Sequence, residues 1–159
     1  PIYSLKDIKF RYIRDYVLDE NSYNEVLKKM MNYKKTSLKK LSKNLWLKNY
    51  HLKKLSDKKH IIGMHAYNHP YKLSNYKYEE QYKELKKNYK HLKNVLNIKP
   101  ISISYPNGSF NNITLKIIKK LKVKFGFISS ISNYNNIREK NYIIKRLDHS
   151  IIIKNFLSN

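Results

Sequence analysis

The sequence predicts an α/β fold with a mostly parallel sheet. Its 159 residues fit one compact domain, and 41% of them are hydrophobic, which is enough for an apolar core. Segments with helical spacing of apolar residues alternate with short apolar segments of strand character. This alternation is the order that builds βαβ units, and no repeat or linker interrupts it. We therefore expect residues 1–159 to form a single domain.

Two helices are predicted in the first part of the chain, both after residue 21. Residues 1–21 mix charged and aromatic side chains without a clear period, whereas apolar residues recur at intervals of four and three over residues 22–33. Residues 41–57 repeat this pattern and predict a second helix. The period then changes, because residues 60–65 are short, apolar and bounded by polar residues, as in a buried strand.

The second part predicts helices and strands in alternation. Its clearest helix runs from Tyr78 to Leu96, with Asn75 as the expected cap and acidic residues in its first turn. The remaining expected elements are a strand at 101–105, a helix at 112–121, strands at 124–128 and 142–147, and a short helix at 151–157.

Composition excludes several classes of protein. The absence of cysteine excludes a disulfide scaffold, a cysteine-ligated zinc site and thiol catalysis. No apolar run reaches the ~18–20 residues of a membrane span, and no signal peptide opens the chain, so the compartment stays unknown. The net charge of +23 suits a nucleic-acid partner. However, the lysines are scattered without a recognition motif, which favours an ordinary solvated surface.

Two loops carry residues that suit chemistry, and each follows a predicted strand. The carboxyl ends of parallel strands meet at one edge of a sheet, so both loops are expected there. In the first loop, His65 and His69 could share a metal ion if the backbone between them turns. The spacing alone favours a pair of hydrogen-bonded loop histidines. A helical zinc-protease motif is excluded, because Ala66 stands where its glutamate is needed and Pro70 stops a helix.

The second loop has the composition of a tight turn. Proline fixes its own φ, and Asn-Gly tolerates positive φ. The turn could simply join a strand to a helix, or it could form a pocket wall that offers backbone N–H groups to an oxyanion. Its residues are Tyr105, Pro106, Asn107, Gly108 and Ser109.

The two loops in this order resemble the polysaccharide deacetylase family (carbohydrate esterase family 4). The resemblance rests on the segments IGMHAYNHP at 62–70 and YPNGSFN at 105–111, separated by one helix, and it is detailed over residues 60–131. It implies a distorted (β/α) barrel and a divalent metal, usually zinc. It also implies hydrolysis of N-acetyl groups from amino sugars of a polysaccharide. His65 and His69 match the metal-binding histidines, and the turn matches the wall of the substrate groove.

The chain also departs from the family pattern. The Asp-Asp pair that would supply the third ligand and the catalytic base is absent, so we expect the barrel to be incomplete at its N-terminus. A missing first strand would expose a sheet edge that can pair with another chain, giving an oligomer. A serine replaces the arginine that often opens the third motif. The general-acid motif has no clean match, and Asp148 and His149 are the nearest candidates for the carboxylate and the acid, with Arg146 beside them.

The expected function is therefore metal-dependent deacetylation of an N-acetylated polysaccharide or oligosaccharide. Because only two neutral ligands are identified, residues 1–159 alone should bind zinc weakly and show little or no activity. A non-catalytic carbohydrate-binding domain is the alternative, and a basic nucleic-acid-binding domain is a more remote one.

Overall fold

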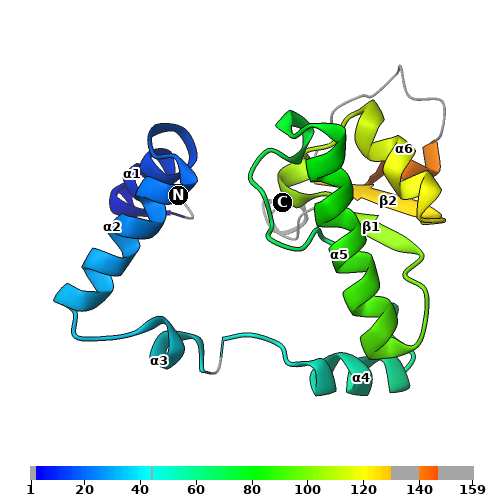
Figure 1. The fold of residues 1–159 in the computed structure, drawn as a ribbon, viewed down its shortest axis with the longest axis horizontal. Helices are drawn as coiled ribbons and strands as arrows, with labels where there is room; N and C mark the ends of the chain where they lie inside the picture. The colour runs from blue at the N-terminus through cyan, green and yellow to red at the C-terminus, as the bar shows by residue number, and fades with distance from the viewer. Residues whose placement is uncertain (1–2, 44, 130–139, 147–159) are drawn as a thin grey trace, which may run out of the picture. The chain divides into compact units, whose positions relative to one another are not determined.

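The computed structural model describes residues 3–43, 45–129 and 140–146. The chain divides into two compact units, residues 1–47 and residues 48–159 (Figure 1). None of the helices in the described ranges has the length and apolar character needed to cross a membrane.

The N-terminal unit is helical. It contains α1 (Leu5–Tyr12), the π-helical turn η1 (Ile13–Val17), α2 (Glu20–Tyr33) and α3 (Leu38–Ser42). No residue of α1 or α3 is buried, and α1 depends on a capping box in which Ser4 and Asp7 bond each other's backbone N–H groups. Helix α2 confirms the helix expected at 22–33. It begins two residues earlier, because the Asp19 carboxylate caps its first turn.

The single helix expected at 41–57 is wrong. α3 ends at Ser42, and α4 (Asn49–Asp57) begins only after a non-helical stretch. The boundary between the two units, after residue 47, falls in that stretch. The apolar side chains there, Leu45 and Trp46, are each 68% exposed, so burial does not hold this segment in a helix.

The C-terminal unit holds a parallel sheet covered by helices. Strand β1 (Ser102–Ser104) pairs with β2 (Phe125–Ile128), and β2 pairs with β3 (Ile144–Lys145), all in parallel. Helices α5 (Tyr78–Leu96) and α6 (Asn112–Lys120) contact each other and lie side by side in front of the strands in Figure 1. Short 3-10 turns complete the unit: η2 (Leu73–Asn75), η3 (Pro106–Gly108) and η4 (Lys140–Tyr142).

The strand expected at 60–65 is reduced to one residue. Met64 forms a parallel bridge with Ile103, in which its N–H donates to the Ser102 carbonyl (2.8 Å) and its carbonyl accepts from the Ser104 N–H (2.9 Å). The ladder stops there, because Ala66 adopts a left-handed φ of 61° that turns the chain away. Met64 is nevertheless almost fully buried, so the segment is anchored beside β1.

Other boundaries differ by small amounts. Lys77, and not Asn75, occupies the N-cap position of α5, because Asn75 is part of the preceding 3-10 turn. The strand expected at 142–147 starts at Ile144, after η4. The helix expected at 151–157 lies outside the described residues.

The buried core belongs to the C-terminal unit and joins its helices to the sheet. Leu85 and Leu92 of α5 and Ile117 and Ile118 of α6 are buried with Ile103 of β1. A polar network is buried with them, in which Thr114 Oγ1 donates to Gln81 Oε1 (2.6 Å) and so ties α6 to α5. The described residues thus form a mixed helix and sheet fold of βαβ type. Closure of a barrel and the single domain at 1–159 stay predictions.

Candidate metal and substrate site

The two predicted loops meet at the carboxyl end of β1. His65 follows the bridge at Met64, and its ring Nδ1 lies 2.8 Å from the backbone carbonyl of Ser104, the last residue of β1. A carbonyl can only accept, so the Nδ1 of the neutral ring carries the proton. Its Nε2 then presents a lone pair, the arrangement usual for a histidine that ligates a metal.

The backbone curls so that His65 and His69 face each other. Their ring centroids are 4.8 Å apart with the planes at 63°, and both residues are exposed. Ala66 and His69 have positive φ values of 61° and 53°, and these form the turn that the metal interpretation requires. Two imidazoles on one zinc ion each hold a nitrogen ~2.0–2.1 Å from it, so close rings are necessary. The closeness of the two rings meets this one requirement.

Helix α5 holds this loop through two polar side chains. The Glu84 Oε2 accepts the N–H groups of Tyr67 (3.2 Å) and Asn68 (2.8 Å), and its Oε1 accepts Asn68 Nδ2 (2.6 Å). The N–H of His65 donates to Asn88 Oδ1 (3.0 Å). These contacts were not expected from the sequence, although polar residues beside the buried Leu85 and Leu92 are a usable signal.

The second loop is a 3-10 turn in which two backbone N–H groups are used internally. The N–H groups of Gly108 and Ser109 donate within the turn to the carbonyls of Tyr105 (3.0 Å) and Pro106 (2.8 Å), and the Tyr105 N–H bonds the neighbouring strand. Proline has no N–H. Among the described contacts, the N–H of Asn107 is therefore the amide of the turn that has no partner. Asn107 is an exposed residue with φ of 50°. The sequence predicted a backbone donor in this turn but did not identify Asn107 as that donor.

The buried part of this turn supports the exposed part. Tyr105 is 1% exposed, stacks on Phe110 (4.5 Å between centroids), and donates its hydroxyl to the Tyr142 carbonyl (3.0 Å). Burial, aided by the neighbouring Tyr142, raises the pKa of Tyr105 well above its ordinary value, so the phenol stays neutral. Within the predicted groove segment we therefore expect Tyr105 and the equally buried Pro106 to support the turn rather than contact substrate.

Hydrogen bonds also join the two loops. Asn107 Nδ2 donates to the Tyr71 carbonyl (3.2 Å), which lies two residues beyond His69. Ser109 Oγ bonds Ser74 through both the backbone N–H (3.0 Å) and the hydroxyl (2.9 Å). The histidine loop and the turn are thus one connected edge of the sheet, as the sequence predicted.

Of the remaining predicted site residues, the structure describes only Arg146, which lies at the carboxyl end of β2. Asp148 and His149 lie outside the described residues. Arg146 is described, and its Nε lies 3.5 Å from the Ile128 carbonyl. Among the residues that the structure describes, no group of three His, Asp or Glu side chains could hold a metal ion.

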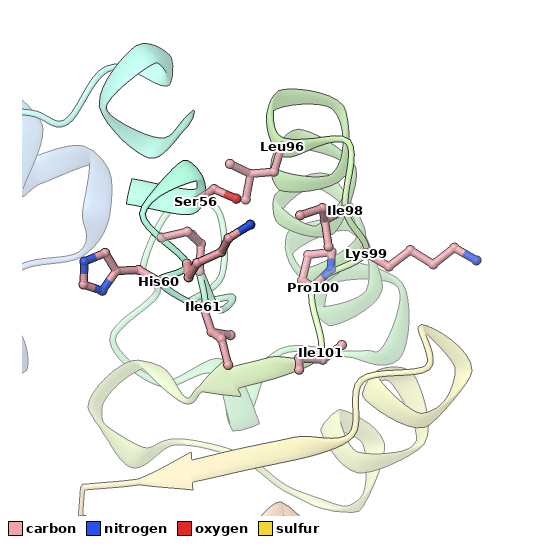
Figure 2. Close-up of a pocket in the computed structure, with 10 residues that line it drawn as sticks. Ser56, His60, Ile61, Leu96, Ile98, Lys99, Pro100 and Ile101 are labelled. Carbon is pink, nitrogen blue, oxygen red and sulfur yellow. The ribbon is translucent and has the colours of Figure 1, made fainter. Parts of the chain in front are cut away.

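A pocket of about 290 Å³ lies at the opposite end of β1. Figure 2 shows Ile98, Pro100 and Ile101 facing Ile61 across it, while the His60 ring points away from it. Its lining is mainly apolar and contains no carboxylate. It therefore offers nothing for the chemistry expected at the histidines.

Comparison with known proteins found one family model and several solved structures. The family model described as polysaccharide deacetylase matches residues 15–126. Among solved structures, the Streptococcus pyogenes deacetylase PplD in complex with acetate is similar at a TM-score of 0.57 and 20% identity, with 91% of this chain and 72% of that chain covered. No curated protein matches.

A second solved structure is a CE4 family pseudoenzyme from Bacillus anthracis, with a TM-score of 0.45 and 19% identity over 67% of this chain and 38% of that chain. The likeness to PplD supports the fold, and the match of the family model extends over more than half of the chain. The chain belongs to the polysaccharide deacetylase family.

Proposed function

We propose that the chain is a carbohydrate deacetylase that removes N-acetyl groups from the amino sugars of a polysaccharide with the help of a divalent metal ion. The observation that carries this proposal is the pair of exposed imidazoles, His65 and His69, held 4.8 Å apart beside the turn at 105–109. Membership of the family supports the reaction class, and the two histidines support metal dependence.

His65 and His69 would hold the ion, with zinc as the expected metal because imidazole suits it. When bound there, zinc would supply a water of lowered pKa, ~7, and polarisation of the acetyl carbonyl. His65 is already oriented for this role by the Ser104 carbonyl. The exposed Asn107 amide, on the adjoining loop, is the group that we expect to donate to the developing oxyanion.

Proton transfer requires two further groups. A carboxylate must take a proton from the attacking water, and an acid must protonate the departing amine. Asp148 and His149 remain our candidates for these roles. Two described carboxylates already have structural roles. Glu84 holds the histidine loop, and Asp7 belongs to the capping box of α1.

Acetate release from N-acetylglucosamine oligomers in the presence of zinc tests this function. We expect weak release that a chelator abolishes and that is absent in His65→Ala and His69→Ala. His91→Ala is the matched control, because His91 is an exposed histidine on α5 outside the loop. Release that is equal in the parent and in both loop variants would contradict the proposal.

A second candidate is a deacetylase-like domain that binds carbohydrate without catalysis. It is favoured by the engagement of Glu84 in holding the loop, which leaves this carboxylate near the histidines unavailable as a base. Binding of an N-acetylated oligosaccharide by the zinc-loaded chain without any acetate release would support this candidate. Zinc-dependent acetate release would exclude it.

A further inference from the structure

We propose that Glu84 and Asn88 of α5 are positioning residues that set the conformation of the loop at 65–69 and, through it, the spacing of the two imidazoles. The proposal rests on the proposed function only in taking His65 and His69 as metal ligands. Neither side chain touches the imidazoles in the contacts described above, so both act through the backbone.

Glu84 is a buried carboxylate with all its described donors in one loop. It is 9% exposed, and a buried carboxylate requires hydrogen-bond donors. The donors are the successive N–H groups of Tyr67 and Asn68, which converge on Oε2, and the Asn68 amide, which bonds Oε1. Successive backbone N–H groups that converge in this way form a concavity suited to an anion. Here the anion is a side chain of the protein itself.

The backbone of the loop needs such support. Ala66 and His69 carry Cβ atoms in the left-handed region, a conformation that persists only where the surroundings impose it. Glu84 binds the two amides that lie between these residues, and Asn88 binds the amide of His65 just before them. Contacts with this one helix therefore lie on both sides of Ala66 and directly before His69.

The helix presents these two contacts in a fixed relation. Positions 84 and 88 are one turn apart and lie on the same face. The neighbouring Leu85 and Leu92 are buried in the core, which holds α5 in place. The conformation of the loop is thus fixed by contacts with a rigid helix rather than by the loop's own side chains. Loss of Glu84 should release Ala66 and His69 and let the imidazoles separate.

A swap of polarity between Glu84 and Asn68 tests this role in the full chain. In Glu84→Gln the Asn68 amide can turn and present its oxygen to the glutamine NH2, so this single variant is the reference for loss of the charge alone. In Asn68→Asp the new carboxylate faces that of Glu84, and no rotation of either group provides a donor between them. In the double variant the glutamine NH2 donates to the aspartate, and its carbonyl oxygen still accepts the two backbone N–H groups. Glu79→Gln, an exposed glutamate in the first turn of α5, is the control.

Two readouts are needed. The first is amide hydrogen exchange at Tyr67 and Asn68 without metal, together with the NMR signals of the two imidazoles. The second is zinc affinity. In Asn68→Asp we expect at least roughly tenfold faster exchange at both amides, after correction for the intrinsic rate of the new residue, and zinc affinity lowered about tenfold, as for loss of an outer-shell partner. The double variant should recover both, and Glu79→Gln should match the parent.

Unchanged exchange and affinity in Asn68→Asp, or no recovery in the double variant, would overturn the proposal. The recovery arm separates positioning from a general loss of stability, because the double variant restores the hydrogen bonds without restoring the original residues. If the parent binds no zinc, the proposed function fails. The exchange and imidazole signals, which need no metal, still decide whether Glu84 positions the loop.

Discussion

Replacement of Gly126 by alanine should strongly destabilise the C-terminal unit. Gly126 lies in the middle of the sheet, paired with Ile103, and a Cβ at this position would meet the Tyr105 hydroxyl, the Tyr142 carbonyl oxygen at 2.6 Å and Tyr105 Cζ at 2.9 Å. The first two atoms are hydrogen-bonded to each other, so neither can move without breaking that bond. A glycine is therefore required at this position, because the side chain of Tyr105 and the backbone of Tyr142 approach it closely.

The magnitude follows from two terms. Overpacking a well-filled site costs about 1–3 kcal/mol, and the loss of the buried hydrogen bond adds about 1 kcal/mol. We expect Gly126→Ala to lower the free energy of unfolding by about 2–4 kcal/mol on this basis, measured by urea denaturation followed by far-UV circular dichroism. Double substitution with Tyr105→Phe should cost less than the sum of the single variants, because the phenylalanine lacks the hydroxyl that clashes.

Gly63→Ala is the matched control. The nearest obstacle to its Cβ is the Ser102 Oγ at 2.7 Å, the end of a small side chain that can rotate. We expect a change within about 1 kcal/mol, since removing a glycine also restricts the unfolded chain. A cost at Gly126 no larger than at Gly63, or strict additivity with Tyr105→Phe, would refute the reasoning.

Three further predictions concern the buried network, the turn and the N-terminal unit. Thr114→Val leaves the buried Gln81 Oε1 without its donor and should cost about 1–3 kcal/mol in urea denaturation, whereas Thr114→Ser should keep most of the stability. Asn107→Gly keeps the left-handed turn, while Asn107→Ala adds strain of ~1 kcal/mol, so the alanine variant should be the less stable by thermal unfolding. Hydrogen bonds from the first turn of α2 lower the pKa of Asp19 below its ordinary value, so the cap stabilises α2 at neutral pH and is lost as pH falls through the lowered pKa. Circular dichroism should show this acid loss of helicity in the parent and not in Asp19→Asn; equal acid profiles would count against the cap.

The sequence was most informative where burial and local pattern agree. The expected bounds of α5 are those observed, and α6 and β2 differ by one residue at one end. Helix α1 was missed because no residue in it is buried, so it has no core-facing stripe for periodicity to reveal. The break between α3 and α4 was missed because its apolar residues fit a helical period but are exposed.

The candidate site, too, could be predicted only in part from the sequence. His65, His69 and the turn at 105–109 could be identified from residue type and order, and the structure brings the two loops together. Glu84 and Asn88 could not be identified in this way, since their partners are backbone amides 16–23 residues away in the chain. Their spacing is a signal that the sequence does contain. Positions 84, 88 and 92 follow one face of α5, and polar residues are unusual on a face where Leu92 is buried.

Zinc titration of the chain, read by competition with a chromophoric chelator, tests the central claim most directly. The claim is that His65 and His69 form part of a metal centre. We predict saturable binding by the parent, an affinity at least roughly tenfold lower in both His65→Ala and His69→Ala, and parental binding in His91→Ala. Zinc binding of equal affinity in the parent and in both loop variants would contradict the claim.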